Sequence, residues 1–139
     1  MKLIKYFIQF VVISFLLILF KILGFKIASN LSSKIFTNIG PLFRSKNLIK
    51  ENIIKAYPNM DSKDLKKIID GMWSNYGRIL SEYVFMNNFR NSKLSDNIKI
   101  KGQGILDKIK NENKPVIFIS GHFNNFELMA MHIEKSGLE

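Results

Sequence analysis

The sequence predicts an α/β protein. A membrane-anchor helix (residues 1–25) and a helical leader (residues 26–93) precede an incomplete parallel βαβα unit (residues 94–139). Three observations lead to this fold class. The chain opens on a long apolar run, its middle carries apolar side chains at helical spacing, and KPVIFIS near the end is a continuous apolar run rich in β-branched residues. Such a run is typical of a strand buried on both faces of a parallel sheet.

The first apolar run is the predicted anchor. Tyr6 to Phe20 falls short of the roughly 20 residues that cross a bilayer, but Leu3 to Phe25 gives 23 positions. Lys5 and Lys21 would then extend their amines toward the headgroups. The alternatives are a cleaved signal peptide, although no small-residue cleavage site follows, and a buried core helix. We expect a single-pass anchor.

The charge distribution supports a membrane partner. The net charge is +10, and residues 1–55 carry nine basic and one acidic residue, net +8. A basic cluster beside an apolar run favours anionic lipid headgroups, whereas no recognition motif supports a nucleic-acid partner. Six basic residues follow the run, up to Lys55, against Lys2 and Lys5 before it. The positive-inside rule therefore predicts that the soluble part faces the cytoplasm.

Helices are predicted throughout the leader. Residues 27–43 form a helix lying on the membrane, which Gly40-Pro41 ends. A short helix follows and stops before Pro58, and a long amphipathic helix begins after Asp61, a good N-cap residue. The apolar face of the long helix consists of Leu65, Ile68, Ile69, Met72, Tyr76, Ile79, Leu80 and Tyr83.

A polar stripe, Asn75, Arg78 and Glu82, runs beside that apolar face. Arg78 and Glu82 are four residues apart and can form an ion pair along the helix, either solvated or at an interface. Alternatively, the stripe holds the headgroup of a substrate or braces an active site. The spacing leaves both interpretations open.

The last segment alternates strands and helices. Ile98 and Ile100 alternate with lysines, as in a half-exposed strand, and ILDKIKNEN gives one apolar side of a short helix. Residues 116–120 are the buried strand, and a helix then runs from Asn124 or Asn125 to about Ser136. Two strands are too few for a stable sheet, so we expect the chain to be the N-terminal part of a longer protein.

His122 stands at the carboxyl end of the predicted buried strand, where open parallel sheets bind their ligands. If the histidine lies in the turn and Glu127 in the first helical turn, the carboxylate can orient the imidazole as a general base. A purely structural histidine is the alternative. The chain has no cysteine and no H-E-x-x-H spacing, and His132 offers no partner, so neither a thiolate nucleophile nor a metal site is predicted.

Several blocks resemble the late acyltransferases of lipid A biosynthesis, within the lysophospholipid acyltransferase-like superfamily. GHFNNFEL resembles that family's Gly-His-x-Gly-Asn-Trp-Glu block, with Asn124 in place of glycine and Phe126 in place of tryptophan. RSKNLIKENIIKAYP, NYGRILSE and IKGQGILDKI are similar to further blocks in the same order along the chain. The resemblance implies that His122 and Glu127 are catalytic and that Asn125 and Arg78 contact substrate.

The resemblance also implies an activity and a location. A fatty acyl chain would move from acyl carrier protein or acyl-CoA to a hydroxyl of a phosphorylated glycolipid acceptor, without a cofactor, at the bacterial inner membrane. Two alternatives remain open. One is an acyltransferase acting on glycerol phosphate lipids, and the other is a membrane-anchored accessory or binding protein without catalytic activity.

Overall fold

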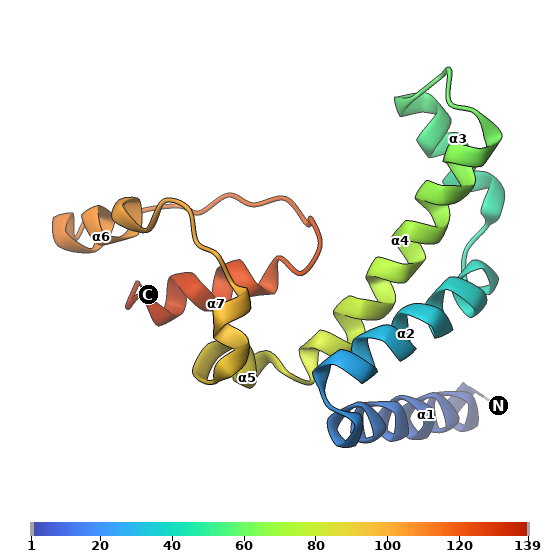
Figure 1. Cartoon of the computed structure of the whole chain (residues 1–139), viewed down its shortest axis with the longest axis horizontal. Coiled ribbons are helices and arrows are strands. Elements are labelled where there is room, and N and C mark those ends of the chain that lie inside the picture. The colour runs from blue at the N-terminus through green and yellow to red at the C-terminus, as the bar shows by residue number, and fades with distance from the viewer. Residues whose placement is uncertain (1, 139) are drawn as a thin grey trace. The chain divides into compact units, whose positions relative to one another are not determined.

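The computed structural model describes residues 2–138. The chain divides between Val84 and Phe85 into two compact units (Figure 1). Each unit is described by itself. The first contains α1 (Lys2–Leu23), α2 (Phe25–Ile39), the 3-10 helix η1 (Gly40–Leu42), α3 (Lys46–Ala56) and α4 (Ser62–Tyr83). The second contains α5 (Met86–Asn91), the 3-10 helix η2 (Lys93–Asn97), α6 (Gln103–Glu112) and α7 (Glu127–Lys135).

The predicted α/β fold class is wrong, because residues 2–138 contain helices and no strand. The two segments predicted as strands, residues 98–100 and 116–120, are non-helical but form no ladder. The side chains of Ile117 and Ile119 are 87% and 92% exposed. A strand needs a neighbour for its backbone N–H and C=O groups, and neither segment provides one for the other. The βαβα unit is therefore replaced by helices joined by extended chain.

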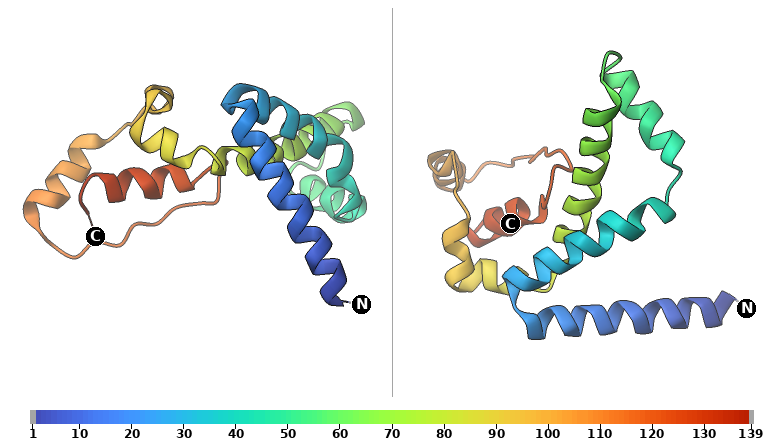
Figure 2. Two further views of the ribbon diagram at one scale, coloured as in Figure 1. Left: turned by 90° about the horizontal axis from the view of Figure 1, so that it is seen from below. Right: turned by 45° about the vertical axis from the view of Figure 1, so that its right-hand side comes forward.

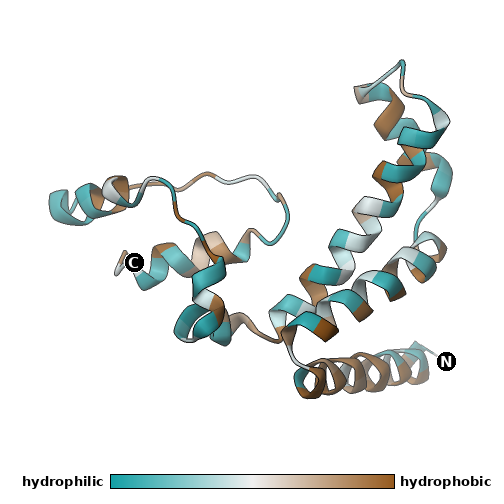
Figure 3. Cartoon of the chain, viewed as in Figure 1, coloured by the Kyte–Doolittle hydropathy of each residue, from teal (hydrophilic) through white to brown (hydrophobic). Residues whose placement is uncertain are grey.

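Helix α1 is long and apolar enough to cross a membrane. Its 22 residues extend about 33 Å at 1.5 Å per residue, close to the thickness of a hydrocarbon core. The helix is apolar along almost its whole length (Figure 3), and Phe20 is its one buried side chain among those described. Gly24 separates α1 from α2, and its φ of 76° is a conformation that favours glycine.

The stop and capping signals predicted for the leader are confirmed, although α2 spans Phe25–Ile39 and not residues 27–43. Helix α2 ends at Ile39, before Gly40-Pro41, and α3 ends at Ala56, before Pro58. Asp61 caps α4: its carboxylate accepts hydrogen bonds from the backbone N–H groups of Lys63 and Asp64, both at 2.8 Å. Such a cap contributes about 1 kcal/mol to helix stability.

Helices α2 and α4 pack closely through small residues. A Cβ atom placed on Gly77 would lie 2.3 Å from the carbonyl oxygen of Ser32, so only glycine permits this approach. The hydroxyls of Ser33 and Ser74 are hydrogen-bonded at 2.7 Å. Ser81 is fully buried. The contact between α2 and α4 is therefore made largely by glycine and serine.

The buried side of the long helix coincides only in part with the predicted apolar face. Leu65 of that face is buried, together with Trp73, Gly77 and Ser81, whereas Tyr76 and Tyr83 of the face are exposed. Hydrophobic spacing selects the most apolar side of a helix. Here the closest packing follows the side on which backbones can approach.

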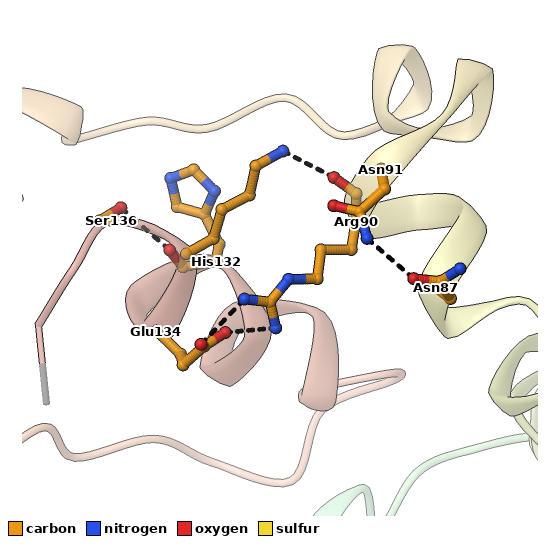
Figure 4. A network of polar contacts seen from close by, with 7 residues as sticks. Asn87, Arg90, Asn91, His132, Glu134 and Ser136 are labelled. Atoms are coloured by element: carbon orange, nitrogen blue, oxygen red, sulfur yellow. Dashed lines mark hydrogen bonds and ion pairs between the residues drawn. The ribbon is translucent and has the colours of Figure 1, made fainter.

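In the second unit, polar contacts hold α7 against its neighbours (Figure 4). Arg90 of α5 forms an ion pair with Glu134, and the Lys135 amine donates to the carbonyl oxygen of Arg90 at 2.6 Å. The hydrogen bond between Arg90 and Glu134 is the main reason that the pKa of Arg90 lies above its ordinary value and that the pKa of Glu134 lies below its ordinary value. The pair therefore stays ionised below the pH at which a free glutamate would take up a proton.

Candidate functional site

His122 lies in the extended chain between α6 and α7, and its imidazole is exposed. The ring lies against the phenyl ring of Phe126, with the ring centroids 4.3 Å apart and the planes tilted by 41°. The backbone turns tightly beside it, because the N–H of Phe123 donates to the carbonyl oxygen of Gly121 at 2.8 Å. The turn predicted at this position is present, although the strand expected before it is not.

Glu127 is the first residue of α7 and is half-buried. The expected order of histidine in the turn and carboxylate in the first helical turn is therefore observed. Among the described residues, however, no hydrogen bond joins His122 to Glu127. The structure places His122 before α7 and Glu127 at its first position, and their pairing stays a prediction.

Asn124 adopts a left-handed conformation, with φ of 49°. Glycine tolerates this region because it has no Cβ, and asparagine because its short polar side chain can hydrogen-bond to the nearby backbone, whereas most other residues lose roughly 1–2 kcal/mol there. This conformation gives a physical reason for asparagine at the position where GHFNNFEL departs from the resembling block. Asparagine can form the same turn that glycine forms.

Replacing Asn124 by glycine is therefore expected to leave the turn and the activity of the whole protein intact. Replacing it by alanine is expected to strain the turn by about 1 kcal/mol and to reduce activity. Asn113, with φ of 47°, ends α6 in the same conformation and provides a matched control. Asn113→Ala should lower the free energy of unfolding without a comparable loss of turnover. Equal turnover in Asn124→Ala and Asn124→Gly would contradict this account.

His122 also lines an apolar hollow of about 350 Å³. The hollow is formed by the extended chain and one side of α7. Its lining comprises Phe118, Ser120, His122, Phe126, Met129, Ala130, Ile133, Glu134 and Leu138. An imidazole at an apolar hollow can approach a reacting group attached to a hydrocarbon chain. The sequence motif did not indicate the roles of Phe118 and Met129, because lining a hollow leaves no characteristic spacing.

Asn125 lies on a second, larger groove of about 610 Å³ in the same unit. Its side chain is half-buried, and apolar side chains of residues 98–106 and 118–133 form most of the lining. His132 lies at this groove too, and its Nε2 is 2.8 Å from the side-chain oxygen of Gln103.

Arg78 belongs to the first unit and not to the unit that contains His122. Its guanidinium donates to the Ser29 hydroxyl at 3.2 Å and to the Asn30 side-chain oxygen at 3.1 Å, both on α2. Gly77, beside it in NYGRILSE, permits the close approach of the same two helices. Gly77 and Arg78 of this block therefore contribute to the packing of α2 against α4. The four-residue spacing of the small residues Gly77 and Ser81 could have indicated this packing from the sequence.

Comparison with known proteins identifies the family. The family model described as bacterial lipid A biosynthesis acyltransferase matches residues 1–138. Neither a curated protein nor a solved structure matches the chain. Since the family match covers nearly every residue, from the apolar helix through the His122 turn to the end of α7, the chain belongs to the bacterial lipid A biosynthesis acyltransferase family.

Proposed function

We propose that this protein transfers a fatty acyl chain from a thioester donor to a hydroxyl group of a lipid A precursor, with His122 as the general base. One observation carries the proposal: in a chain of this family, His122 lies at an apolar hollow directly before the helix that Glu127 opens. The hollow suits a hydrocarbon chain, and the imidazole suits removal of a proton from a hydroxyl.

The proposed reaction needs no covalent enzyme intermediate. His122 takes the proton of the acceptor hydroxyl while the hydroxyl oxygen attacks the thioester carbonyl carbon. The tetrahedral intermediate then collapses, the C–S bond breaks, and the thiol leaves with a proton returned by the imidazolium. Glu127 would stabilise that imidazolium after a rotation of the turn, since catalytic hydrogen bonds often shorten only when substrate is bound.

The partners follow from the same proposal. The donor is acyl carrier protein or acyl-CoA, and the acceptor is a phosphorylated glycolipid in the bacterial inner membrane, with the soluble part facing the cytoplasm. The length and apolar composition of α1 and the basic N-terminal half support this location. Asn125, half-buried at the larger groove, is the better-placed substrate contact. A substrate role for Arg78 stays a prediction, because its guanidinium also contacts α2.

Mass spectrometry of lipid A from cells that lack the gene tests the acceptor. We expect each lipid A molecule to lose one acyl chain and to regain it when the intact gene is restored. The His122→Ala gene should not restore it. An unchanged acyl count in the cells without the gene would contradict lipid A as the acceptor.

A further inference from the structure

We propose that Arg90 neutralises Glu134 at the hollow beside His122, and that this neutralisation allows the hollow to accept a hydrocarbon chain. The inference rests on the proposed function, because it takes the fatty acyl chain of the donor as the occupant. Glu134 is the one carboxylate among the described residues that line the hollow, and most of the other lining side chains are apolar. A bare carboxylate at this position would oppose the entry of hydrocarbon.

Arg90 reaches this carboxylate from outside the hollow. Helix α5 lies beside α7 (Figure 2), and Arg90 of α5 is not among the lining residues. Its guanidinium pairs with both carboxylate oxygens of Glu134: Nη2 donates to Oε1 at 2.8 Å, and Nη1 forms the ion pair with Oε2 (Figure 4). No other cation in the described part of the chain forms an ion pair with Glu134. A fork of this kind cancels the charge and satisfies both oxygens at once.

The ion pair has little influence on the stability of the fold. The side chains of Arg90 and Glu134 are 39% and 58% exposed, and ion pairs this exposed contribute little to folding. Helix α7 is also held by contacts that need neither charge. The Lys135 amine donates to the backbone carbonyl oxygen of Arg90, and the Lys110 amine donates to that of Ser136 at 3.1 Å. Helix α7 should therefore keep its place when the charge at position 90 is removed.

The binding of a chain would change the hydration of the carboxylate. In the empty hollow, water can solvate the exposed side chain of Glu134. A hydrocarbon chain displaces the water on the side of the carboxylate that lines the hollow, which is costly for an unpaired charge. The N–H groups of Arg90 hydrogen-bond to both oxygens and keep this cost small. Arg90 therefore acts through Glu134 on how tightly the hollow binds the chain.

Binding of a dodecanoyl chain tests the proposal without requiring turnover. The probe is a dodecanoyl thioether analogue of coenzyme A, and its Kd is measured for the whole protein in phosphatidylglycerol vesicles, corrected for binding to vesicles without protein. We expect Arg90→Gln to raise the Kd roughly three- to tenfold, less than for a fully buried charge because part of Glu134 stays in water. Arg90→Lys keeps the positive charge and should raise the Kd less than Arg90→Gln.

A second substitution distinguishes neutralisation from a structural role. Adding Glu134→Gln to Arg90→Gln should lower the Kd again, because no bare carboxylate then remains at the hollow. Lys66→Gln, which frees the exposed Asp70 on α4, is the matched control and should leave the Kd unchanged. Equal Kd values for Arg90→Gln and the unchanged protein would overturn the proposal. So would a double variant that binds no better than Arg90→Gln, which would show that the pair acts only through structure.

Initial rates of acyl transfer to a lipid A precursor separate this proposal from the proposed function. The expected pattern of Kd values without any acyl transfer would contradict the proposed function and leave the neutralising role of Arg90 intact. Acyl transfer with one Kd across all variants would overturn the role of Arg90 alone. If the unchanged protein does not bind the probe, the hollow holds no hydrocarbon chain and the proposal fails.

Discussion

Replacing His122 by alanine is expected to lower acyl transfer by about 10²- to 10⁴-fold, the usual contribution of a general base. The substitution removes the proposed proton acceptor at the apolar hollow and leaves the membrane helix unchanged. The measurement is the initial rate of acyl transfer to a lipid A precursor, with the protein as the cell makes it. The fraction of protein in the membrane should not change.

His132→Ala is the matched control for that variant. This imidazole belongs to the same unit but contacts Gln103 and does not line the hollow at His122. His132 lines the larger groove but has no proposed part in proton transfer, so we expect His132→Ala to lose far less activity than His122→Ala. Similar losses in both variants would indicate a general structural effect, and full activity in His122→Ala would exclude His122 as the base.

Replacing Gly77 by alanine is expected to lower the free energy of unfolding by about 1–3 kcal/mol. The new methyl group would lie 2.3 Å from the Ser32 carbonyl oxygen, so α2 and α4 would have to move apart. The same movement would lengthen the hydrogen bonds from Arg78 to α2. Denaturant titration in detergent, followed by circular dichroism, measures the change.

Gly71→Ala provides a control of opposite sign. Gly71 lies in the same helix, and a Cβ atom there would meet nothing within 4 Å. Alanine restricts the unfolded chain and favours the helix, so this variant should gain roughly 0.5–1 kcal/mol. If the two variants were equally stable, the close approach at Gly77 would have no energetic importance.

Much of the helical leader could be predicted because local chemistry determines it. Asp61 caps its helix with its own carboxylate, and Pro58 and Pro41 disfavour helical backbone at the residues before them, where α3 and α2 end. The apolar run of α1 similarly depends on composition alone. The turn at His122 was also predictable, because Gly121 and the asparagines that follow it favour a change of chain direction.

The strand and the buried face of α4 could not be predicted in the same way, because they depend on residues distant in the sequence. Residues 116–120 are suited to a strand, but a strand forms only against a partner. The burial of Gly77 depends on Ser32, which α2 places against it. At the site, the sequence predicted the order of His122 and Glu127 but could not predict the distance between their side chains.

The glycine and serine contact between α2 and α4 has a consequence for how the leader tolerates its surroundings. Its cohesion depends on close van der Waals contact and on hydroxyl and guanidinium hydrogen bonds more than on the expulsion of water. Helices in lipid associate by the same means, because hydrocarbon offers no hydrophobic driving force. The two helices can therefore remain joined both in water and among lipid headgroups, so a change from one to the other need not alter the shape of the leader.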